Sequence, residues 1–278
     1  MRKTRYAVAA MAAAAALTLS ACGSEAGSDS AESGDAESIR IGIKFDQPGL
    51  GFAEAGSYAG FDVDVAKYVA AELGYGEDQI EWIETPSAQR ENMLENDQVD
   101  MIFATYSITD TRKEKVGFAG PYFVAGQDLL VRSDSDISGP EDLNGKTLCS
   151  VTGSTSAQKV KDTLANEANL VEQPSYAECV TAMQGGAIDA VTTDDIILAG
   201  LASTDANKGQ FKVVGNTFSE EKYGVGIQKD SDKCEDINAA IEKMIEDGAW
   251  EEAIKKNTEG ADYTFNAELN PPAMDACA

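Results

Sequence analysis

Four short segments of the sequence place charged or hydroxyl side chains directly after apolar runs. In one of them, Ser107 and Arg112 present a hydroxyl and a guanidinium on the same side of a short turn. Arginine pairs with a carboxylate through two parallel hydrogen bonds, a geometry that lysine cannot reproduce. The turn therefore indicates carboxylate binding, although a surface turn with a solvated arginine would contain the same residues.

A second segment, residues 151–156, reads Val-Thr-Gly-Ser-Thr-Ser and opens a predicted helix. Free N–H groups at a helix N-terminus attract anions such as carboxylates. Ser154 and Thr155 are therefore candidate ligand-binding residues, and an ordinary Ser/Thr cap is the alternative for this segment. It is not a phosphate loop, because no Gly-Lys-Ser or Gly-Lys-Thr ending follows.

One carboxylate and two cations complete the candidate binding groups. Asp194 follows a predicted strand, where it could bind an ammonium group, cap the next helix, or do both. Lys44 lies just beyond the first predicted strand, and Arg90 lies on the second predicted helix. The formal net charge is −26, so a basic residue inside a pocket indicates a specific role. The same charge argues against nucleic acid as a partner, because phosphate binding needs a basic surface.

The N-terminal residues are typical of an exported lipoprotein. Residues 1–21 combine a basic start with an apolar run that is too short to span a bilayer, which predicts a signal peptide. The sequence Leu-Ser-Ala before Cys22 is a lipobox-like pattern, which implies cleavage there and acyl chains such as palmitate on the new N-terminus. An ordinary signal peptide with a chance cysteine is the alternative. Residues 22–38 are small and polar, which predicts a lipid-anchored, disordered tether.

Strand and helix patterns alternate through the remaining chain, which predicts an α/β fold of two mostly parallel lobes joined by a two-strand hinge. Helices are expected over 61–73, 87–96 and 154–165. We expect lobe 1 to comprise residues 39–130 plus 229–278, and lobe 2 to comprise residues 131–228. Ligands of such sheets bind beyond the carboxyl ends of the strands, so the cleft between the lobes is the expected site.

Four cysteines remain once Cys22 is assigned to the lipid, and in an exported protein they are expected to form disulfides. Three pairings are possible. We favour Cys149–Cys179 and Cys234–Cys277, because each pair lies within one predicted lobe. A zinc site is the alternative, but the chain has no histidine and no Cys-x-x-Cys spacing, so no metal is expected.

The order of four stretches along the chain resembles the polar amino-acid-binding proteins of ABC importers. These stretches read GFDVDVAKYVAAELG, PSAQRENMLENDQVDMIFATYSITDTRKEKVGFAGPYF, DLNGKTLCSVTGSTSAQ and GGAIDAVTTD. The resemblance covers residues 40–256, and the most similar group is the glutamate-binding lipoproteins of Gram-positive uptake systems. It implies a periplasmic-binding-protein-like fold with a ligand cleft between the lobes.

The resemblance also implies roles for individual residues. Arg112 is expected to bind the α-carboxylate of an amino acid, together with the backbone N–H groups of Ser107 and Thr155. Asp194 is expected to bind the α-ammonium group, together with the carbonyl of Thr105 and the hydroxyl of Ser107.

The expected side-chain specificity rests on Lys44 and Arg90. Relatives that bind cationic amino acids have an acidic residue at the position of Lys44, and glutamate- or aspartate-binding relatives have basic residues at both positions. Lys44 and Arg90 are therefore the candidates for binding a side-chain carboxylate. Many relatives carry an aromatic ring at the position of Gln47, so another ring is expected to cover the ligand, with three candidates: Phe52, Tyr58 and Phe61.

The resemblance implies an extracellular, monomeric binding subunit that closes around glutamate and delivers it to a permease with its ATPase. No cofactor and no catalysis are expected, because the chain has no histidine and no nucleophile–base pair. Three alternatives remain open: the same role for glutamine or aspartate, a sensor module, and an enzyme on the same fold.

Overall fold

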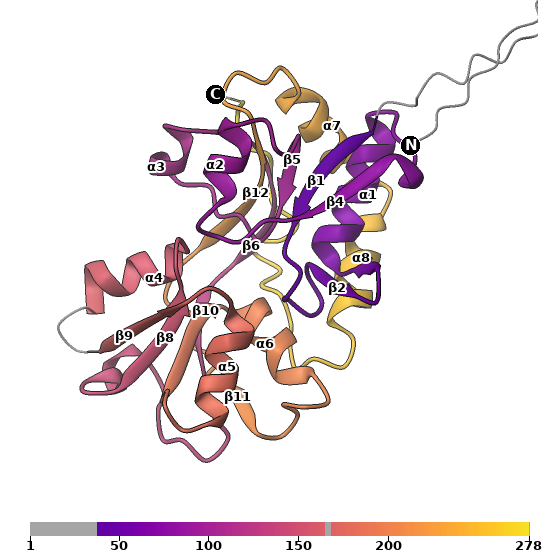
Figure 1. Ribbon diagram of the computed structural model, residues 1–278. Helices are drawn as coiled ribbons and strands as arrows, with labels where there is room; N and C mark the ends of the chain where they lie inside the picture. Colours follow the sequence, from indigo (N-terminus) through magenta and orange to yellow (C-terminus); the bar gives the residue numbers. More distant parts are fainter. Residues whose placement is uncertain (1–37, 165–167, 278) are drawn as a thin grey trace, which may run out of the picture. The chain divides into compact units, whose positions relative to one another are not determined.

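Two five-stranded sheets, each with its own helices, form the two lobes of the folded chain (Figure 1). The computed structural model describes residues 38–164 and 168–277. The strand order is β4-β1-β5-β12-β6 in the first sheet and β11-β7-β10-β8-β9 in the second. We call the lobe of the first sheet lobe 1 and that of the second sheet lobe 2.

The strands are β1 (Ile39–Ile43), β2 (Phe52–Glu54), β3 (Ser57–Ala59), β4 (Ile80–Glu84), β5 (Met101–Phe103), β6 (Gly117–Ala125), β7 (Gln127–Arg132), β8 (Thr147–Val151), β9 (Asn169–Gln173), β10 (Ala190–Asp194), β11 (Phe211–Val213) and β12 (Glu221–Ile227). The α-helices are α1 (Phe61–Glu72), α2 (Arg90–Glu95), α3 (Asp110–Lys113), α4 (Thr155–Lys159), α5 (Tyr176–Gln184), α6 (Asp195–Ser203), α7 (Cys234–Glu246) and α8 (Ala249–Thr258). Short 3₁₀ turns lie at η1 (Glu77–Gln79) and η2 (Pro140–Leu143), and η3 (Val160–Leu164) is a π-helical segment.

The apolar pattern of the N-terminal elements explains the core of lobe 1. Ile41 and Ile43 of β1 are fully buried, and α1 covers them with a face that includes Val65 and Val69, one turn apart. The helix stops before Gly74, whose φ of 92° is the left-handed conformation common after helix ends. The helix predicted here is confirmed.

Both sheets are mixed, so the expectation of mostly parallel lobes is wrong in this respect. In lobe 1, β1 pairs in parallel with β4 and β5, whereas β12 is antiparallel to both β5 and β6. Lobe 2 repeats this arrangement, with β8 parallel to β9 and β10, and β7 antiparallel to β10 and β11. In lobe 1, β6 leads the chain out of the lobe and its neighbour β12 brings it back, so these two strands run in opposite directions.

The chain changes lobe at Gly126, between β6 and β7, and returns between Val213 and Glu221. The lobe boundaries expected after Leu130 and after Gln228 therefore do not coincide with the points at which the chain passes from one sheet to the other. The first falls inside β7, and the second falls after β12, which belongs to the sheet of lobe 1. Every residue of β6 and nearly every residue of β7 is buried, including the polar residues Gln127 and Asp128 that follow the crossing.

Other expected boundaries also differ from the structure. The helix α2 begins at Arg90 rather than at Ser87, because the Ser87 hydroxyl accepts a hydrogen bond from Lys44 and does not cap the helix. The helix expected over 154–165 is α-helical only through Lys159 and continues as the π-helical segment. The strands β6 and β9 and the hairpin of β2 with β3 were not predicted.

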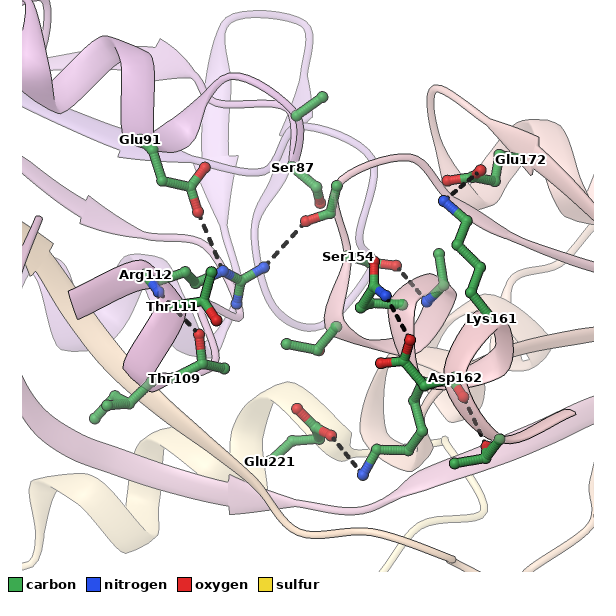
Figure 2. Close-up of a pocket in the computed structure, with 18 of the residues that line it drawn as sticks. Ser87, Glu91, Thr109, Thr111, Arg112, Ser154, Lys161, Asp162, Glu172 and Glu221 are labelled. Carbon is green, nitrogen blue, oxygen red and sulfur yellow. Dashed lines mark hydrogen bonds and ion pairs between the residues drawn. The ribbon is translucent and has the colours of Figure 1, made fainter. Parts of the chain in front are cut away.

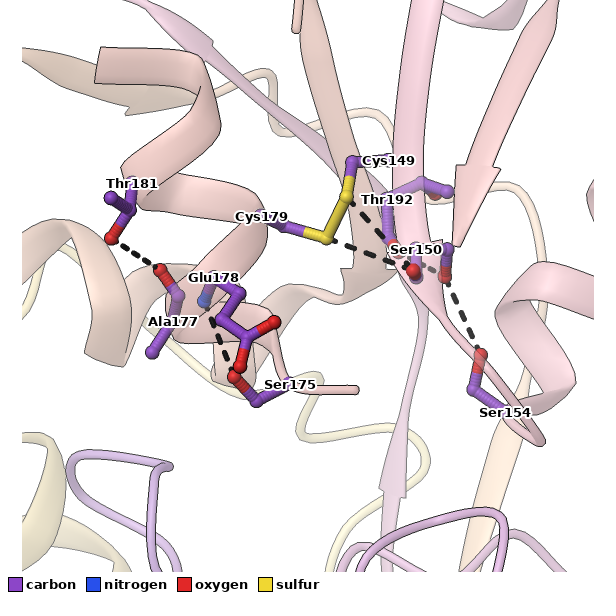
Figure 3. The surroundings of a disulfide bond; sticks show 9 residues. All are labelled: Cys149, Ser150, Ser154, Ser175, Ala177, Glu178, Cys179, Thr181 and Thr192. Carbon is purple, nitrogen blue, oxygen red and sulfur yellow. Dashed lines mark hydrogen bonds between the residues drawn. A yellow bond between two sulfur atoms is a disulfide. The ribbon is translucent and has the colours of Figure 1, made fainter. Parts of the chain in front are cut away.

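Both favoured disulfide pairings are present. Cys149 on β8 is bonded to Cys179 on α5, with their Cα atoms 5.7 Å apart (Figure 3). Cys234 at the start of α7 is bonded to Cys277, with Cα atoms 5.9 Å apart. Residues 37–278 form one compact unit that contains both sheets and both disulfides.

Some expectations lie outside the described residues. These are the signal peptide, the lipidated Cys22 and all but the last residue of the tether. Within residues 38–164 and 168–277, no helix has the length and apolar character needed to cross a membrane.

Candidate ligand-binding site

Asp194 ends β10 as a buried carboxylate with one free oxygen. Its Oδ2 accepts a 2.6 Å hydrogen bond from the Tyr223 hydroxyl, and its Oδ1 has no hydrogen-bond partner among the described residues. The side chain does not cap α6; Asp195 instead accepts the Ile196 N–H at 2.8 Å. Burial raises the pKa of Asp194 well above its usual range, and the charge of Glu221 adds to the effect. A cation beside Oδ1 would therefore be strongly stabilised.

Arg112 lies on α3 and is held in place by three acceptors. Its Nε donates to the carboxylate of Glu91 at 3.1 Å, Nη1 to the carbonyl of Ser107 at 2.7 Å, and Nη2 to the carbonyl of Gly153 at 3.0 Å. Gly153 belongs to lobe 2, so the last bond crosses between the lobes (Figure 2). The guanidinium also lies over the ring of Tyr106, 4.9 Å from its centroid. Each terminal nitrogen keeps a second N–H that could bind a carboxylate.

Lys44 and Arg90 are buried cations of lobe 1, only 5% and 2% exposed. The Nζ atom of Lys44 donates to the Ser87 hydroxyl at 2.8 Å, and Nη1 of Arg90 donates to the Ala104 carbonyl at 2.8 Å. The Nε atom of Arg90 has no hydrogen-bond partner among the described residues. Burial, and then the charge of Arg90, lower the pKa of Lys44 to about 7; burial is also the main cause that lowers the pKa of Arg90 to about 10. An anion placed between them would favour both charged forms.

Hydroxyl groups from the two lobes meet beside these charges. The Oγ atom of Ser107 in lobe 1 lies 3.3 Å from the Oγ1 atom of Thr155 in lobe 2. The Ser154 hydroxyl accepts the backbone N–H of Ala157 at 3.0 Å, so it caps α4 as the alternative interpretation of this segment expected.

Asp62 is a buried carboxylate of the site that the sequence analysis missed. Its Oδ2 accepts the backbone N–H of Thr105 at 3.0 Å, and its Oδ1 accepts the Tyr122 hydroxyl at 2.8 Å. Thr105 has a φ of 47°, in the left-handed region that a threonine rarely adopts, so the bond to Asp62 stabilises an unusual backbone conformation. Burial raises the pKa of Asp62 to about 6, although both hydrogen bonds and the charges of Arg90 and Lys44 oppose that shift.

A small cavity between the lobes collects most of the predicted site residues. The five that line it are Arg90, Thr105, Ser154, Thr155 and Asp194. The other three adjoin it: Ser107 contacts Thr155, Lys44 contacts the lining residue Ser87, and Arg112 lines the neighbouring groove. The free volume of the cavity is about 10 Å³, about that of one water molecule, so a larger ligand would require its walls to move.

A larger groove of about 920 Å³ shares Ser87, Ser154 and Thr155 with the cavity. Figure 2 shows that several charged side chains along this groove lie in pairs of opposite sign, whereas Asp162 accepts a hydrogen bond from the amide of Gln158. The pairs are Arg112 with Glu91 at 3.1 Å, Lys159 with Glu221 at 3.8 Å, and Lys161 with Glu172 at 2.8 Å. Asp162 and Glu220 are outside these pairs, so the groove lining has an excess of carboxylates.

Five lining residues of the cavity were not among the candidates: Ser87, Ser156, Tyr176, Thr193 and Ile197. Thr193 could have been found, because it directly precedes Asp194 at the end of a strand. Of the three rings expected to cover a ligand, Phe61 is wrong, since it is fully buried in the core and packs edge-on against Trp250 at 5.7 Å. The aromatic ring that lines the cavity is Tyr176.

Two α/β lobes with a double crossing, and polar groups of both charges around a cavity between them, define a two-lobed binding protein of the periplasmic-binding-protein fold. The chain belongs to the bacterial extracellular solute-binding proteins, family 3, whose family model matches residues 39–259. In the described part of the chain, no group of three or more potential metal ligands is clustered.

Sequence relatives within this family include two amino-acid-binding proteins. The chain is 47% identical to the glutamate-binding protein GluB of Corynebacterium efficiens, over 91% of this chain and 90% of that protein. It is 39% identical to the glutamine-binding protein GlnH of an ABC transporter of Bacillus subtilis, over 87% of this chain and 92% of that protein. A solved structure, an ancestral arginine-binding protein bound to glutamine, is similar with a TM-score of 0.72 and 33% identity, over 79% of this chain and 96% of that chain.

Proposed function

We propose that this chain is the substrate-binding subunit of an ABC importer and that its ligand is L-glutamate. The observation that carries the proposal is the distribution of charge around the cavity between the lobes. On the lobe 1 side, the buried cation Arg90 lines the cavity, and a second buried cation, Lys44, adjoins it through Ser87. On the lobe 2 side lies Asp194, a buried carboxylate with a free oxygen. A ligand with an ammonium group at one end and a second carboxylate at the other compensates all three charges.

The proposed contacts follow from the donors and acceptors that remain available. Arg112 keeps N–H groups on both terminal nitrogens, which suit the α-carboxylate of an amino acid. The free Oδ1 of Asp194 suits the α-ammonium group. Lys44 and Arg90 suit the side-chain carboxylate, which would relieve the unfavourable burial of two like charges.

Glutamine is the second candidate, because GlnH of Bacillus subtilis is named as a glutamine-binding protein and is 39% identical to this chain. Against it, a neutral amide would not stabilise the charged forms of Lys44 and Arg90, whose pKa values are lowered by burial. Sites built for a charged group discriminate strongly against neutral analogues for this reason.

Binding is proposed to proceed by hinge motion at the crossings near Gly126 and Glu221. The cavity is lined from both lobes and is too small for an amino acid, so entry requires the lobes to separate. We further propose that the signal peptide is cleaved before Cys22 and that lipid on Cys22 holds the monomer on the outer face of the membrane. The closed protein then delivers its ligand to a permease without catalysing a reaction. The lipobox-like pattern supports the anchor.

Calorimetric titration of residues 37–278 tests the ligand. The protein is first unfolded and refolded with its disulfides intact, which removes any copurified amino acid, and is then titrated with L-glutamate, L-glutamine, L-aspartate and L-arginine. Tight binding of glutamate, weakened strongly by Lys44→Met, is the expected result. Preference for glutamine would overturn the charge argument but not the binding role, whereas no binding of any amino acid would overturn the importer function.

A further inference from the structure

Tyr223 joins the two halves of the site although it lies on neither ligand-contacting loop. It is a fully buried residue of β12, beside the point where the chain returns to lobe 1. Its backbone forms a bridge with Ser107, next to the Arg112 turn. Its hydroxyl reaches into lobe 2 and donates to Oδ2 of Asp194 at 2.6 Å.

The geometry of Asp194 shows what this hydrogen bond does. One carboxylate oxygen is occupied by the Tyr223 hydroxyl, and the other, Oδ1, is buried without a partner among the described residues. Asp194 also lines the small cavity. A donor fixed on Oδ2 stops the carboxylate from rotating and reserves Oδ1 for the cavity.

We propose that Tyr223 is a positioning residue for ligand binding: its hydroxyl orients the Asp194 carboxylate so that Oδ1 accepts the α-ammonium group of the bound amino acid. The inference rests on the proposed amino-acid-binding function, and it holds for any α-amino acid, whether or not the ligand is glutamate.

The hydroxyl has a second effect, because it stabilises the ionised form of a carboxylate that burial disfavours. Burial and two neighbouring carboxylates, Glu221 on β12 and Asp195 on α6, oppose the ionisation of Asp194. The other titratable and charged groups around it are Tyr223 on β12, Tyr176 on α5, Arg112 on α3 and Tyr263 in the segment after α8. Among the described residues, Tyr223 donates the hydrogen bond to this carboxylate and Arg112 brings an opposite charge, so removal of the hydroxyl makes the ionised form less stable.

A purely structural role predicts a different result. The ring of Tyr223 packs 5.8 Å from that of Phe123 and 6.1 Å from that of Tyr122, measured between centroids. Tyr223→Phe keeps these ring contacts and removes one oxygen atom. If the ring alone matters, this variant will bind like the wild type.

The test compares Tyr223→Phe with the wild type by calorimetry between pH 5 and pH 8, on residues 37–278. Loss of one hydrogen bond to a charged group is expected to weaken amino-acid binding by roughly 10- to 100-fold at pH 8. The loss should grow as the pH falls, because Asp194 in the variant retains its proton to a higher pH and a protonated carboxyl binds an ammonium group poorly. Tyr68→Phe is the matched control, since the Tyr68 hydroxyl also donates to an aspartate, Asp247, at 2.6 Å, but at an exposed position.

Several outcomes overturn the proposal and remain distinct from failure of the proposed function. Equal affinities of Tyr223→Phe and the wild type would overturn it, and so would a loss that does not change with pH. If Tyr223→Phe does not fold, judged by circular dichroism, Tyr223→Met would be measured instead, because it also lacks the hydroxyl but has a flexible side chain that adapts to the space of the ring; an affinity equal to that of the wild type would overturn the proposal. A wild type that prefers glutamine would refute glutamate as ligand, and the same comparison would then be made with glutamine.

Discussion

Glutamate binding should be accompanied by uptake of a proton at Lys44. The Nζ atom of Lys44 is buried and donates to an uncharged hydroxyl, that of Ser87. Burial and the charge of Arg90 lower its pKa to about 7, so the free protein carries a mostly neutral lysine above that pH. A bound side-chain carboxylate favours the ammonium form and raises the pKa again. Lys44 must then bind a proton from solution.

The size of the effect follows from the pKa in the free protein. With a pKa of about 7, roughly nine-tenths of Lys44 is neutral at pH 8 and roughly one-tenth at pH 6. Glutamate should therefore take up about 0.9 proton at Lys44 at pH 8 and about 0.1 at pH 6. Because the bound state holds more protons than the free state, this coupling weakens the affinity by up to about tenfold per pH unit above pH 7.

The assay is calorimetry at pH 8 in two buffers that differ in ionisation enthalpy, which reports the number of protons exchanged. Asp194 also exchanges a proton when it binds the ammonium group, so the quantity to compare is the difference between the wild type and Lys44→Met. That variant keeps the length of the side chain but cannot titrate. A difference near zero would refute the assignment of Lys44 to the side-chain carboxylate, and so would the same difference with glutamine.

Three further predictions concern other parts of the molecule. Arg112→Lys should weaken glutamate binding by roughly 100-fold in calorimetry, because an ammonium group cannot make two parallel bonds to a carboxylate; an unchanged affinity would contradict its role. Gly200→Ala should weaken binding about tenfold, because the added Cβ atom would lie 2.2 Å from the carbonyl of Pro48 in the other lobe. It should not lower the melting temperature of the free protein, because alanine favours the helix over glycine by about 1 kcal/mol. The control is Gly185→Ala, where the added Cβ atom makes ordinary contacts. Replacing Cys149 and Cys179 by serine should lower the free energy of unfolding by about 3–4 kcal/mol in urea denaturation, since the disulfide spans 30 residues; a loss below about 1 kcal/mol would contradict this.

Side-chain type, chain order and the family resemblance led to residues that the structure brings together. Asp194 at the end of a strand, Ser154 at the start of a helix, and Arg90, suggested by the resemblance, line the same cavity. Asp62 was not found, because an acidic residue in the first turn of a helix is usually a solvated one. The tertiary contacts with Thr105 and Tyr122 distinguish it from Asp64, the other acidic residue of that turn, which is half-buried.

Elements of the fold were predictable where the sequence has a clear periodic pattern of apolar residues. Amphipathic periodicity marks helices such as α1, whereas β6 lies within the interior of lobe 1 and has no alternation to mark its limits. At the crossing, Gly126, Gln127 and Asp128 interrupt the apolar run, but a short polar interruption of this kind does not show that the chain changes sheet. The turn before Arg90 shows the opposite failure, since Ser87 is a good capping residue whose hydroxyl serves the site instead.

The placement of cations explains how an acidic protein can select an anion. At physiological ionic strength, exposed charges are screened within about 8 Å, so the net charge of −26 acts weakly on a ligand already in the cleft. Along the groove, Lys159 and Lys161 are each paired with a glutamate and contribute little field. In contrast, Lys44 donates a hydrogen bond to the Ser87 hydroxyl and Arg90 donates one to the Ala104 carbonyl, so both acceptors are uncharged. Both cations are buried, where salt screens a charge least. Selectivity for an acidic side chain should therefore persist at high salt, and a glutamate affinity that falls steeply between 0.1 M and 1 M salt would show that surface charges dominate instead.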